Sequence, residues 1–302
     1  MDKEIKEKYL KAGRIAKKTL DMVKTKVKEG IKLADVTDFI EENIKKMGGG
    51  LAFPAQISVN NIAAHYAALF EDKTVFKKND MVKIDIGVHI DGYIADTAIT
   101  IIVGEKPDEK LERLSLASKE ALDNALEIIK PGIEIREIGK IIQDTITKFG
   151  FSPVINLSGH GLERYQIHCK PSIPNFDNRT KEKLKEGQVI AIEPFATDGK
   201  GKIYESSNAS VFSLIEEKPV RSRITREILR EIKKYNRMPF SERRLMKKFG
   251  KGKTIIALKE LMGRNLIQDY PPLPEINGGM ISQWEHSVII EKKPVVFTRD
   301  IN

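Results

Sequence analysis

The sequence predicts an α+β fold made of two related halves, with a helical insertion in the second half. Residues 28–48 recur in diverged form as residues 130–150, with 7 of 21 positions identical at an offset of 102. Residues 77–85 align with residues 185–193 at an offset of 108. Amphipathic helices can resemble one another by chance, but two alignments at nearly equal offsets indicate an internal duplication.

Each half is expected to begin with two helices and to continue as an antiparallel sheet. Roughly residues 3–28 and 110–130 have a helical pattern, and each is followed by one repeated segment. That segment opens with a Gly-Ile turn, has apolar residues at three- and four-residue spacing, and ends on a glycine suited to a helix C-terminus. Two such halves, related by approximate two-fold symmetry, would form a central antiparallel sheet covered by helices, with a site at the axis.

The clearest strand signal surrounds the Asp-Gly pair at residues 91–92, which interrupts alternating apolar and polar residues. Asp-Gly is favoured in two-residue hairpin turns, because both central residues need positive φ. A hairpin closed there pairs Gly87 with Asp96 and puts Asp85 opposite Ala98. The carboxylates of Asp85 and Asp96 then share one face, with Cα atoms roughly 7–8 Å apart. A divalent cation can bridge such a pair, and the alternative is a solvated face with two ordinary acids.

A basic helical segment interrupts the second half at about residues 215–275. Between Lys218 and Arg264 there are 16 Lys and Arg against 4 Glu and no Asp, in a chain of net charge +9. We therefore divide the chain into a duplicated main domain, residues 1–214 and 276–302, and a winged-helix-like insertion. The basic face of the insertion is either a solvated surface or a contact for RNA or the ribosome.

Composition limits the classes of protein and of metal site. The chain has 302 residues, of which 40% are hydrophobic and 31% charged, as in a soluble globular protein. No apolar run approaches the ~20 residues that span a bilayer, and the polar start lacks a signal-peptide core, so we expect a cytoplasmic protein without membrane contact. The single cysteine, Cys169, leaves no internal disulfide. Any bound metal must be held by His, Asp and Glu.

Further residues of these types lie in separate segments along the chain. The alignment of the halves makes Glu193 the counterpart of Asp85. A single histidine is more often a polar core or surface residue than a metal ligand. The remaining candidates are therefore considered as a group, which consists of His65, His160, His168 and Glu285. Four carboxylates with one imidazole suit Mn²⁺, Fe²⁺, Co²⁺ or Zn²⁺ in a paired site. A water shared by two such ions loses its proton near neutral pH, and such a site can hydrolyse amides.

The chain resembles the methionine aminopeptidases of the pita-bread fold over essentially its whole length. The resemblance rests on Ala-Phe-Pro at residues 52–54 and Ala-Ala-His at residues 63–65, followed in order by Asp85, Asp96, His160, Glu193 and Glu285. The basic segment between the last two glutamates is similar to the insertion of the type 2 subfamily, and the short N-terminal region is similar to that of the archaeal form.

The resemblance implies a ligand set for two divalent metal ions. Asp96 and Glu285 would bridge both ions, Asp85 would complete the shell of one, and His160 and Glu193 would complete the shell of the other. The residues alone placed Asp96 beside Asp85 and made Asp85 equivalent to Glu193. They did not show that His160 reaches the same point.

The resemblance also implies roles toward the substrate. Glu193 would move a proton between the attacking water and the departing amine. His65 and His168 would contact the substrate and stabilise the scissile amide by hydrogen bonds, and Phe53 would line the pocket for the methionine side chain. The implied reaction, in a monomer, is removal of the N-terminal methionine from nascent polypeptides whose second residue is small and uncharged.

Two rival interpretations come from other classes of the same fold. X-Pro dipeptidases and aminopeptidase P use the same ligand types, but they generally carry a separate N-terminal domain, for which the roughly 50 residues before Phe53 leave no room. A pseudo-peptidase would act as a binding module through the basic insertion. Such relatives lose metal ligands, whereas all five are present here, so binding in addition to catalysis stays open.

Overall fold

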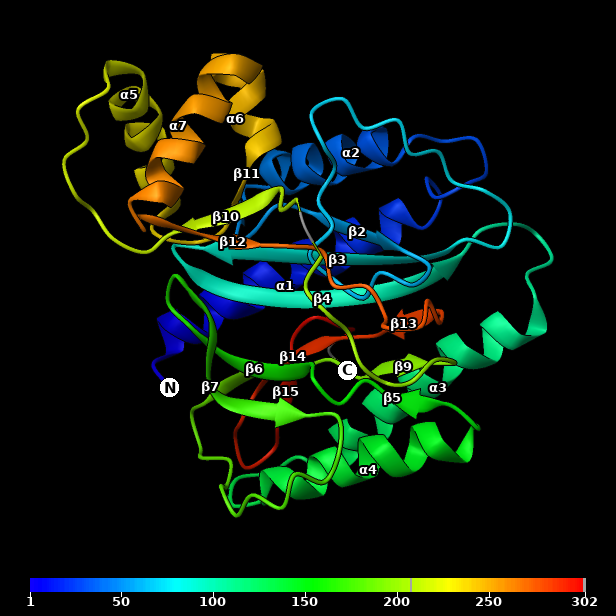
Figure 1. Ribbon diagram of the computed structural model, residues 1–302. Coiled ribbons are helices and arrows are strands. Elements are labelled where there is room, and N and C mark those ends of the chain that lie inside the picture. Colours follow the sequence, from blue (N-terminus) through cyan, green and yellow to red (C-terminus); the bar gives the residue numbers. More distant parts are fainter. Residues whose placement is uncertain (207, 301–302) are drawn as a thin grey trace.

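The computed structural model describes residues 1–206 and 208–300 (Figure 1). Each half opens with two helices: α1 (Lys3–Val23) and α2 (Leu33–Lys46) in the first, α3 (Glu109–Ile128) and α4 (Ile135–Lys148) in the second. Asp2 and Asp108 begin α1 and α3 by accepting hydrogen bonds from backbone N–H groups of the first turn. Helix α1 ends earlier than predicted, because the chain turns after Val23 and brings Val27 into the core.

The internal duplication is visible in equivalent hydrogen bonds. The bounds of α2 and α4 differ by the predicted offset of 102. Lys32 forms an isolated bridge with Val75, and Glu134 forms the matching bridge with Lys183. Both helices end before a glycine with positive φ, Gly48 at 81° and Gly150 at 85° in their backbones. The predicted repeat is therefore a repeat of structure.

The first half contains a four-stranded antiparallel sheet built around a long hairpin. Its strands are β1 (Gly50–Leu51), β2 (Gln56–Val59), β3 (Met81–Ile90) and β4 (Tyr93–Ile102). The predicted register is confirmed, because Gly87 pairs with Asp96 and Asp85 with Ala98. The turn at residues 91–92 has φ of 52° and 88°, as a type I′ turn requires.

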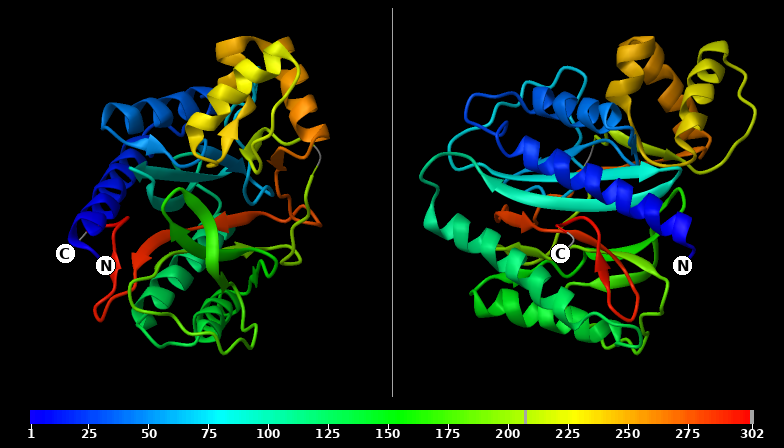
Figure 2. Two further views of the ribbon diagram at one scale, coloured as in Figure 1. Left: turned by 90° about the vertical axis from the view of Figure 1, so that its left-hand side faces the viewer. Right: turned by 180° about the vertical axis from the view of Figure 1, so that it is seen from behind.

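The second half contains two further antiparallel sheets, one of five strands and one of three. One has the order β15-β14-β8-β6-β7 and the other β13-β9-β5. The strand bounds are β5 (Ser152–Pro153), β6 (Ser158–Glu163), β7 (Gln166–Pro174), β8 (Val189–Ile192), β9 (Phe195–Thr197), β13 (Ile281–Gln283), β14 (His286–Ile289) and β15 (Val295–Val296). Seen from behind, α1 crosses the first-half sheet, where it packs against β3 and β4, and α3 packs against β9 and β13 of the second half (Figure 2).

The sheets of the two halves meet along β4. The backbone N–H of Glu285 donates to the carbonyl of Ala98 at 3.0 Å. Thr97 Oγ1 donates to the carbonyl of Glu285 at 2.7 Å, and Thr100 Oγ1 donates to the carbonyl of Gln283 at 2.6 Å. These buried threonines replace part of a regular strand ladder, so the central sheet is joined at the axis largely through side chains.

The remaining elements form a small unit beside α2. They are β10 (Val211–Leu214), α5 (Arg223–Ile232), the 3-10 helix η1 (Lys233–Tyr235), β11 (Phe240–Ser241), α6 (Glu242–Phe249), α7 (Lys251–Gly263) and β12 (Ile267–Tyr270). A separate hydrophobic cluster, which includes Phe212, Ile228 and Leu261, holds them together. We call residues 211–270 the inserted unit. The division into residues 1–214 with 276–302 and residues 215–275 stays a proposal, with β10 as the strand that leads into the insertion.

None of the helices in the described residues is both long enough and apolar enough to cross a membrane.

Candidate metal centre

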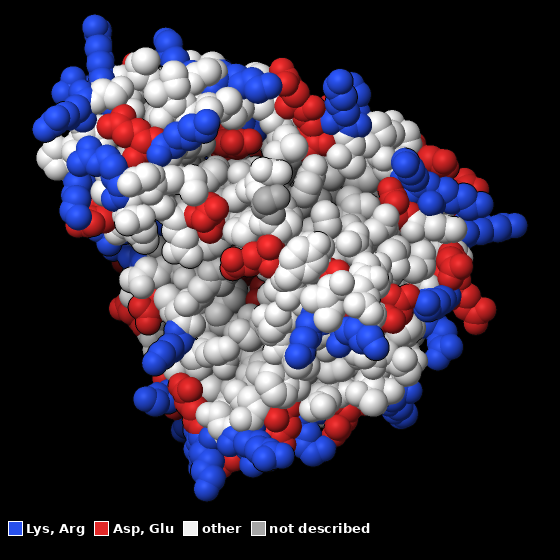
Figure 3. Space-filling model, viewed as in Figure 1, with Lys and Arg blue, Asp and Glu red and all other residues white. Residues whose placement is uncertain are grey.

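A cavity of about 400 Å³ opens where the sheets of the two halves meet. In the space-filling view, Lys and Arg side chains gather at the outline, notably over α5 to α7, while the hollowed middle of the face is mainly uncharged (Figure 3). Every site residue predicted from the sequence lines the cavity: Phe53, His65, Asp85, Asp96, His160, His168, Glu193 and Glu285.

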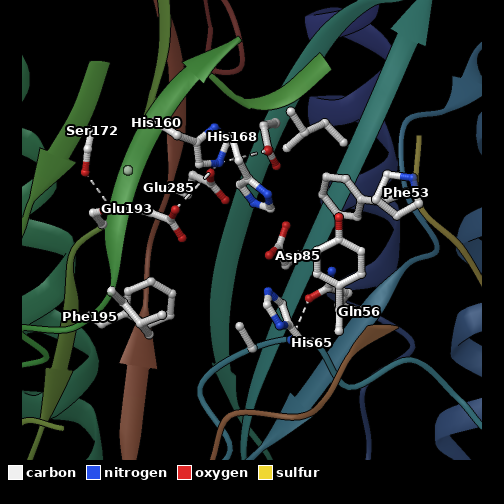
Figure 4. Close-up of a pocket in the computed structure, with 18 of the residues that line it drawn as sticks. Phe53, Gln56, His65, Asp85, His160, His168, Ser172, Glu193, Phe195 and Glu285 are labelled. Atoms are coloured by element: carbon white, nitrogen blue, oxygen red, sulfur yellow. Dashed lines mark hydrogen bonds and ion pairs between the residues drawn. The ribbon is translucent and has the colours of Figure 1, made fainter. Parts of the chain in front are cut away.

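The five predicted metal ligands come from five separate segments, each within a strand or shortly after one. Asp85 lies on β3 and Asp96 on β4, where the hairpin register turns both toward the cavity. His160 lies on β6, while Glu193 and Glu285 follow directly after β8 and β13. In Figure 4 the side chains of His160, Glu193 and Glu285 converge on one side of Asp85. The structure thus brings His160 to the carboxylates, which the sequence had not established.

The distances within this group suit metal coordination. One ligand atom from each of Asp96, His160 and Glu285 lies within 4.8 Å of the others. His160 Nε2 is 3.7 Å from Asp96 Oδ2 and also 3.7 Å from Glu193 Oε1. These separations are too long for hydrogen bonds, and they leave room for an ion between the atoms.

Burial makes this group electrostatically costly without a cation. Burial raises the pKa of Asp85 to about 7. The pKa values of Asp96, Glu193 and Glu285 also rise well above their ordinary range, first through burial and then through repulsion by neighbouring carboxylates. Burial lowers the pKa of His160 to about 3, so its ring is neutral. A neutral imidazole and several carboxylates in one cavity form a ready set of ligands for divalent ions.

The hydrogen-bond partners point to the same conclusion. Asp85 Oδ1, Asp96 Oδ1 and Glu285 Oε2 are buried and have no partner among the described residues. His160 Nδ1 donates to the carbonyl of Gly161 at 3.2 Å, which leaves the lone pair of Nε2 facing the carboxylates. Buried acceptors without donors are rare in folded proteins. A bound divalent cation would satisfy these oxygens and the imidazole nitrogen together.

The two other predicted histidines lie on the cavity walls. In Figure 4 His65 and His168 stand on opposite sides of Asp85. Both have left-handed backbones, with φ of 66° at His65 and 61° at His168, and such strain in non-glycine residues tends to gather at functional sites. Burial lowers the pKa of His65 to about 4 and also lowers that of His168. Both rings are therefore neutral at neutral pH.

Two glutamines that the sequence prediction omitted support this group. Gln283 is buried beside the carboxylates and donates from Nε2 to Glu193 Oε2 at 3.3 Å. Gln56 Oε1 accepts the backbone N–H of His65 at 2.7 Å and so fixes that loop. Gln283 stands two residues before Glu285, and Gln56 stands opposite Asp85 in the sheet. The strand pairing identifies Gln56 and the hydrogen bond to Glu193 identifies Gln283, and both contacts exist only in the folded chain.

Comparison with known proteins places the chain in a family. The model of metallopeptidase family M24 matches residues 7–251. The chain belongs to metallopeptidase family M24. A relative from Thermococcus onnurineus, named methionine aminopeptidase, is 45% identical over 97% of this chain and 99% of its own length. Another of that name, from Archaeoglobus fulgidus, is 42% identical over 96% and 97%. The family is one of metallopeptidases, and the group of Asp96, His160 and Glu285 has the residue types and spacing that could hold a metal ion.

Solved structures confirm the pita-bread fold of the M24 chain. The methionine aminopeptidase from Thermotoga maritima aligns with a TM-score of 0.74 at 23% identity, covering 99% of this chain and 98% of that one. A thermophilic Arx1 aligns with a TM-score of 0.87 at 17% identity, covering 98% and 91%. The prolidase from Pyrococcus furiosus has a TM-score of 0.63 at 22% identity, and only 65% of its chain is matched.

Proposed function

We propose that this M24 peptidase is a dinuclear-metal methionine aminopeptidase that removes the N-terminal methionine from nascent polypeptides whose second residue is small and uncharged. The observation that carries the proposal is the convergence of four carboxylates, two of them fully buried, and one neutral imidazole, with unpartnered buried oxygens, in a cavity that also has apolar walls. Full-length relatives at 42% and 45% identity bear the name of this activity. The amide bond is the substrate group that such a site can hydrolyse.

The metal ligands would divide between two ions, which we take to be Co, Mn, Fe or Zn. Asp96 and Glu285 would hold both, while Asp85 would complete one shell and His160 with Glu193 the other. When bound, the ions would polarise the scissile carbonyl and lower the pKa of an attacking water.

The side chains around the ligands would handle protons and orient the substrate. Glu193 Oε2 accepts a hydrogen bond from the Gln283 amide, and Glu193 Oε1 lies on the side of His160. From there Oε1 would carry a proton to the departing amine. The neutral rings of His65 and His168 would hydrogen-bond to the scissile amide from opposite sides and stabilise the charge that develops there.

The apolar part of the cavity would receive the methionine side chain. Phe53 and Phe195 line it, and the ring of Tyr270 contacts His65 edge-on with centroids 5.7 Å apart. An apolar pocket of this kind binds an unbranched thioether side chain favourably, because such a side chain can adapt to the shape of the pocket. We further propose that the enzyme works as a cytoplasmic monomer.

Release of free methionine from Met-Ala-Ser and Met-Leu-Ser tests the function. The metal-stripped protein should be inactive, and added Co²⁺ or Mn²⁺ should restore cleavage of Met-Ala-Ser far more than of Met-Leu-Ser. Absence of cleavage by folded, metal-loaded protein would reject the aminopeptidase proposal. Equal cleavage of both peptides would reject the small-residue rule alone.

A second proposal concerns contact of the insertion with RNA or the ribosome. Arg223, Arg226 and Arg230 follow one another at helical spacing on α5 and are exposed. No carboxylate among the described residues forms an ion pair with them. Basic residues on α6, by contrast, pair with acids of this chain. Changing the three α5 arginines to Glu should abolish a salt-sensitive co-sedimentation with ribosomes while leaving Met-Ala-Ser cleavage intact, and unchanged co-sedimentation would contradict the contact.

A further inference from the structure

The loop that carries His65 has little regular structure of its own. Residues 60–72 contain only isolated bridges, at Ile62 and Ala67. His65 in this loop has a φ of 66°. A non-glycine residue keeps a left-handed backbone only where its surroundings hold it there. The position of the His65 ring therefore depends on what the loop contacts.

On one side the loop is held by the first-half sheet. Gln56 Oε1 accepts the N–H of His65 at 2.7 Å, and the N–H of Ile57 donates to the carbonyl of Tyr66 at 2.8 Å. Both partners belong to β2, whose neighbour β3 carries Asp85. This side fixes the loop relative to the metal ligands.

On the other side the loop is held by the inserted unit and its flanks. Ser210 Oγ, just before β10, donates to the carbonyl of Ala67 at 3.0 Å. Lys251 Nζ at the start of α7 pairs with Glu71 at 2.6 Å. The N–H of Ala63 donates to the carbonyl of Leu273 at 2.8 Å, just after β12. One contact from the inserted unit, at Lys251, and two from its flanking residues, Ser210 and Leu273, therefore hold the His65 loop.

The inserted unit is itself anchored to α2 by an ion pair between a buried arginine and a partly exposed aspartate. Arg243 is only 6% exposed, and its guanidinium donates to both oxygens of Asp38 at 2.6 and 2.7 Å. Lys247 Nζ reaches the same two oxygens at 2.8 and 3.0 Å. A two-pronged Arg–carboxylate contact fixes orientation as well as distance. Figure 1 shows α6 lying against α2 at this contact.

A continuous chain of contacts joins this anchor to His65. Arg243 follows Glu242, whose backbone N–H donates to the carbonyl of Ser210 at 2.9 Å. Ser210 in turn donates to Ala67, two residues beyond His65. We propose that the inserted unit is a positioning element for His65, with Asp38 and Arg243 as its anchor and Ser210 as its link to the loop. The proposal rests on the substrate-binding role proposed above for His65.

The test compares three variants of the full-length, metal-loaded protein. Arg243→Lys keeps the charge but loses the two-pronged contact, and Ser210→Ala removes the single donor to the loop. Lys248→Gln is the matched control, because Lys248 also lies on α6 and pairs with Glu231 inside the inserted unit. We expect Arg243→Lys and Ser210→Ala to lower kcat/KM for Met-Ala-Ser by about threefold to tenfold, and Lys248→Gln to leave it unchanged.

A double-mutant cycle separates positioning from general loss of structure. In a His65→Ala background, Arg243→Lys and Ser210→Ala should cause no further loss, because the group that they position is already gone. Losses that multiply with that of His65→Ala would overturn the proposal, as would wild-type kinetics in both single variants. If Arg243→Lys does not fold, Ser210→Ala decides alone. A wild-type protein that fails to cleave Met-Ala-Ser would instead reject the proposed function.

Discussion

Glu193 is the residue on which the proposed proton transfer depends. Changing Glu193 to Gln keeps the shape and the contact with Gln283 but removes the proton acceptor. We expect kcat for Met-Ala-Ser to fall at least about 100-fold, while the far-ultraviolet circular dichroism stays that of the folded protein. Metal analysis of the same sample reports whether a ligand is lost as well. The exposed Glu186→Gln is the control, and undiminished turnover of Glu193→Gln would remove Glu193 from the proton path.

His168 offers a test of the substrate-binding wall in which no proposed metal ligand is replaced. We expect His168→Ala to lower kcat/KM by about 100-fold, because a neutral hydrogen-bonding ring beside the scissile amide is gone. Bound metal should be unchanged. Since His168 has a φ of 61°, His168→Asn is a useful companion, because Asn tolerates that backbone better than Ala. Equal losses in both variants would assign the effect to the ring, and full activity in His168→Asn would assign it to the backbone.

At the scale of elements, features that depend on residues close together in the sequence were predicted correctly. The Asp-Gly turn set the register of β3 and β4, so the shared face of Asp85 and Asp96 followed from the sequence. The approach of His160 did not follow, because it depends on how two sheets pack across an axis. The burial of Arg243 could not be predicted from the sequence either, because a run of basic residues on a helix usually faces water. Here an aspartate on α2 lies opposite Arg243 and pairs with it. Pairwise contacts over such distances need the assembled fold.

The β3–β4 hairpin also supports a prediction about the methionine pocket. Gly87 on β3 lies against Phe53, and a Cβ placed there would be 2.3 Å from Phe53 Cε1. We expect Gly87→Ala to push the ring out of place and to raise KM for Met-Ala-Ser about tenfold, with bound metal unchanged. Gly252→Ala on α7 is the control, because an added Cβ there meets nothing within 4 Å. An unchanged KM in a folded Gly87→Ala variant would argue against Phe53 as the wall of that pocket.

At the scale of the whole molecule, the duplication explains why the site is both buried and acidic. Each half contributes an equivalent strand to the axis, so Asp85 and Glu193 face one cavity from two sides. Packing helices behind both halves removes these carboxylates from water. The fold thereby creates an electrostatic cost that a bound cation offsets, and stability becomes linked to metal and to pH.

That linkage has a definite sign in the metal-free protein. The pKa of Asp85 is about 7 in the fold against 3.8 for an ordinary Asp, and the pKa values of the other three carboxyls are raised as well. At a pH between the ordinary pKa of a carboxyl group and its raised pKa in the fold, the folded chain holds protons that the unfolded chain has released. The free energy of unfolding therefore falls as pH rises. The neutral histidines His65 and His160 act in the opposite direction, but only below about pH 6.5.

We therefore expect metal-free protein to be less stable at about pH 8 than at about pH 6.5, by about 1–2 kcal/mol. Excess Mn²⁺ should flatten or reverse this trend, because ions bind the deprotonated carboxylates and bind them more tightly as pH rises. Chemical denaturation at both pH values, with chelator or with Mn²⁺, measures the difference. Asp85→Asn should show a smaller pH dependence than wild type when metal-free. A metal-free protein equally stable at both pH values would mean that the carboxylates ionise in the fold without cost, and the electrostatic argument for the metal site would fail with it.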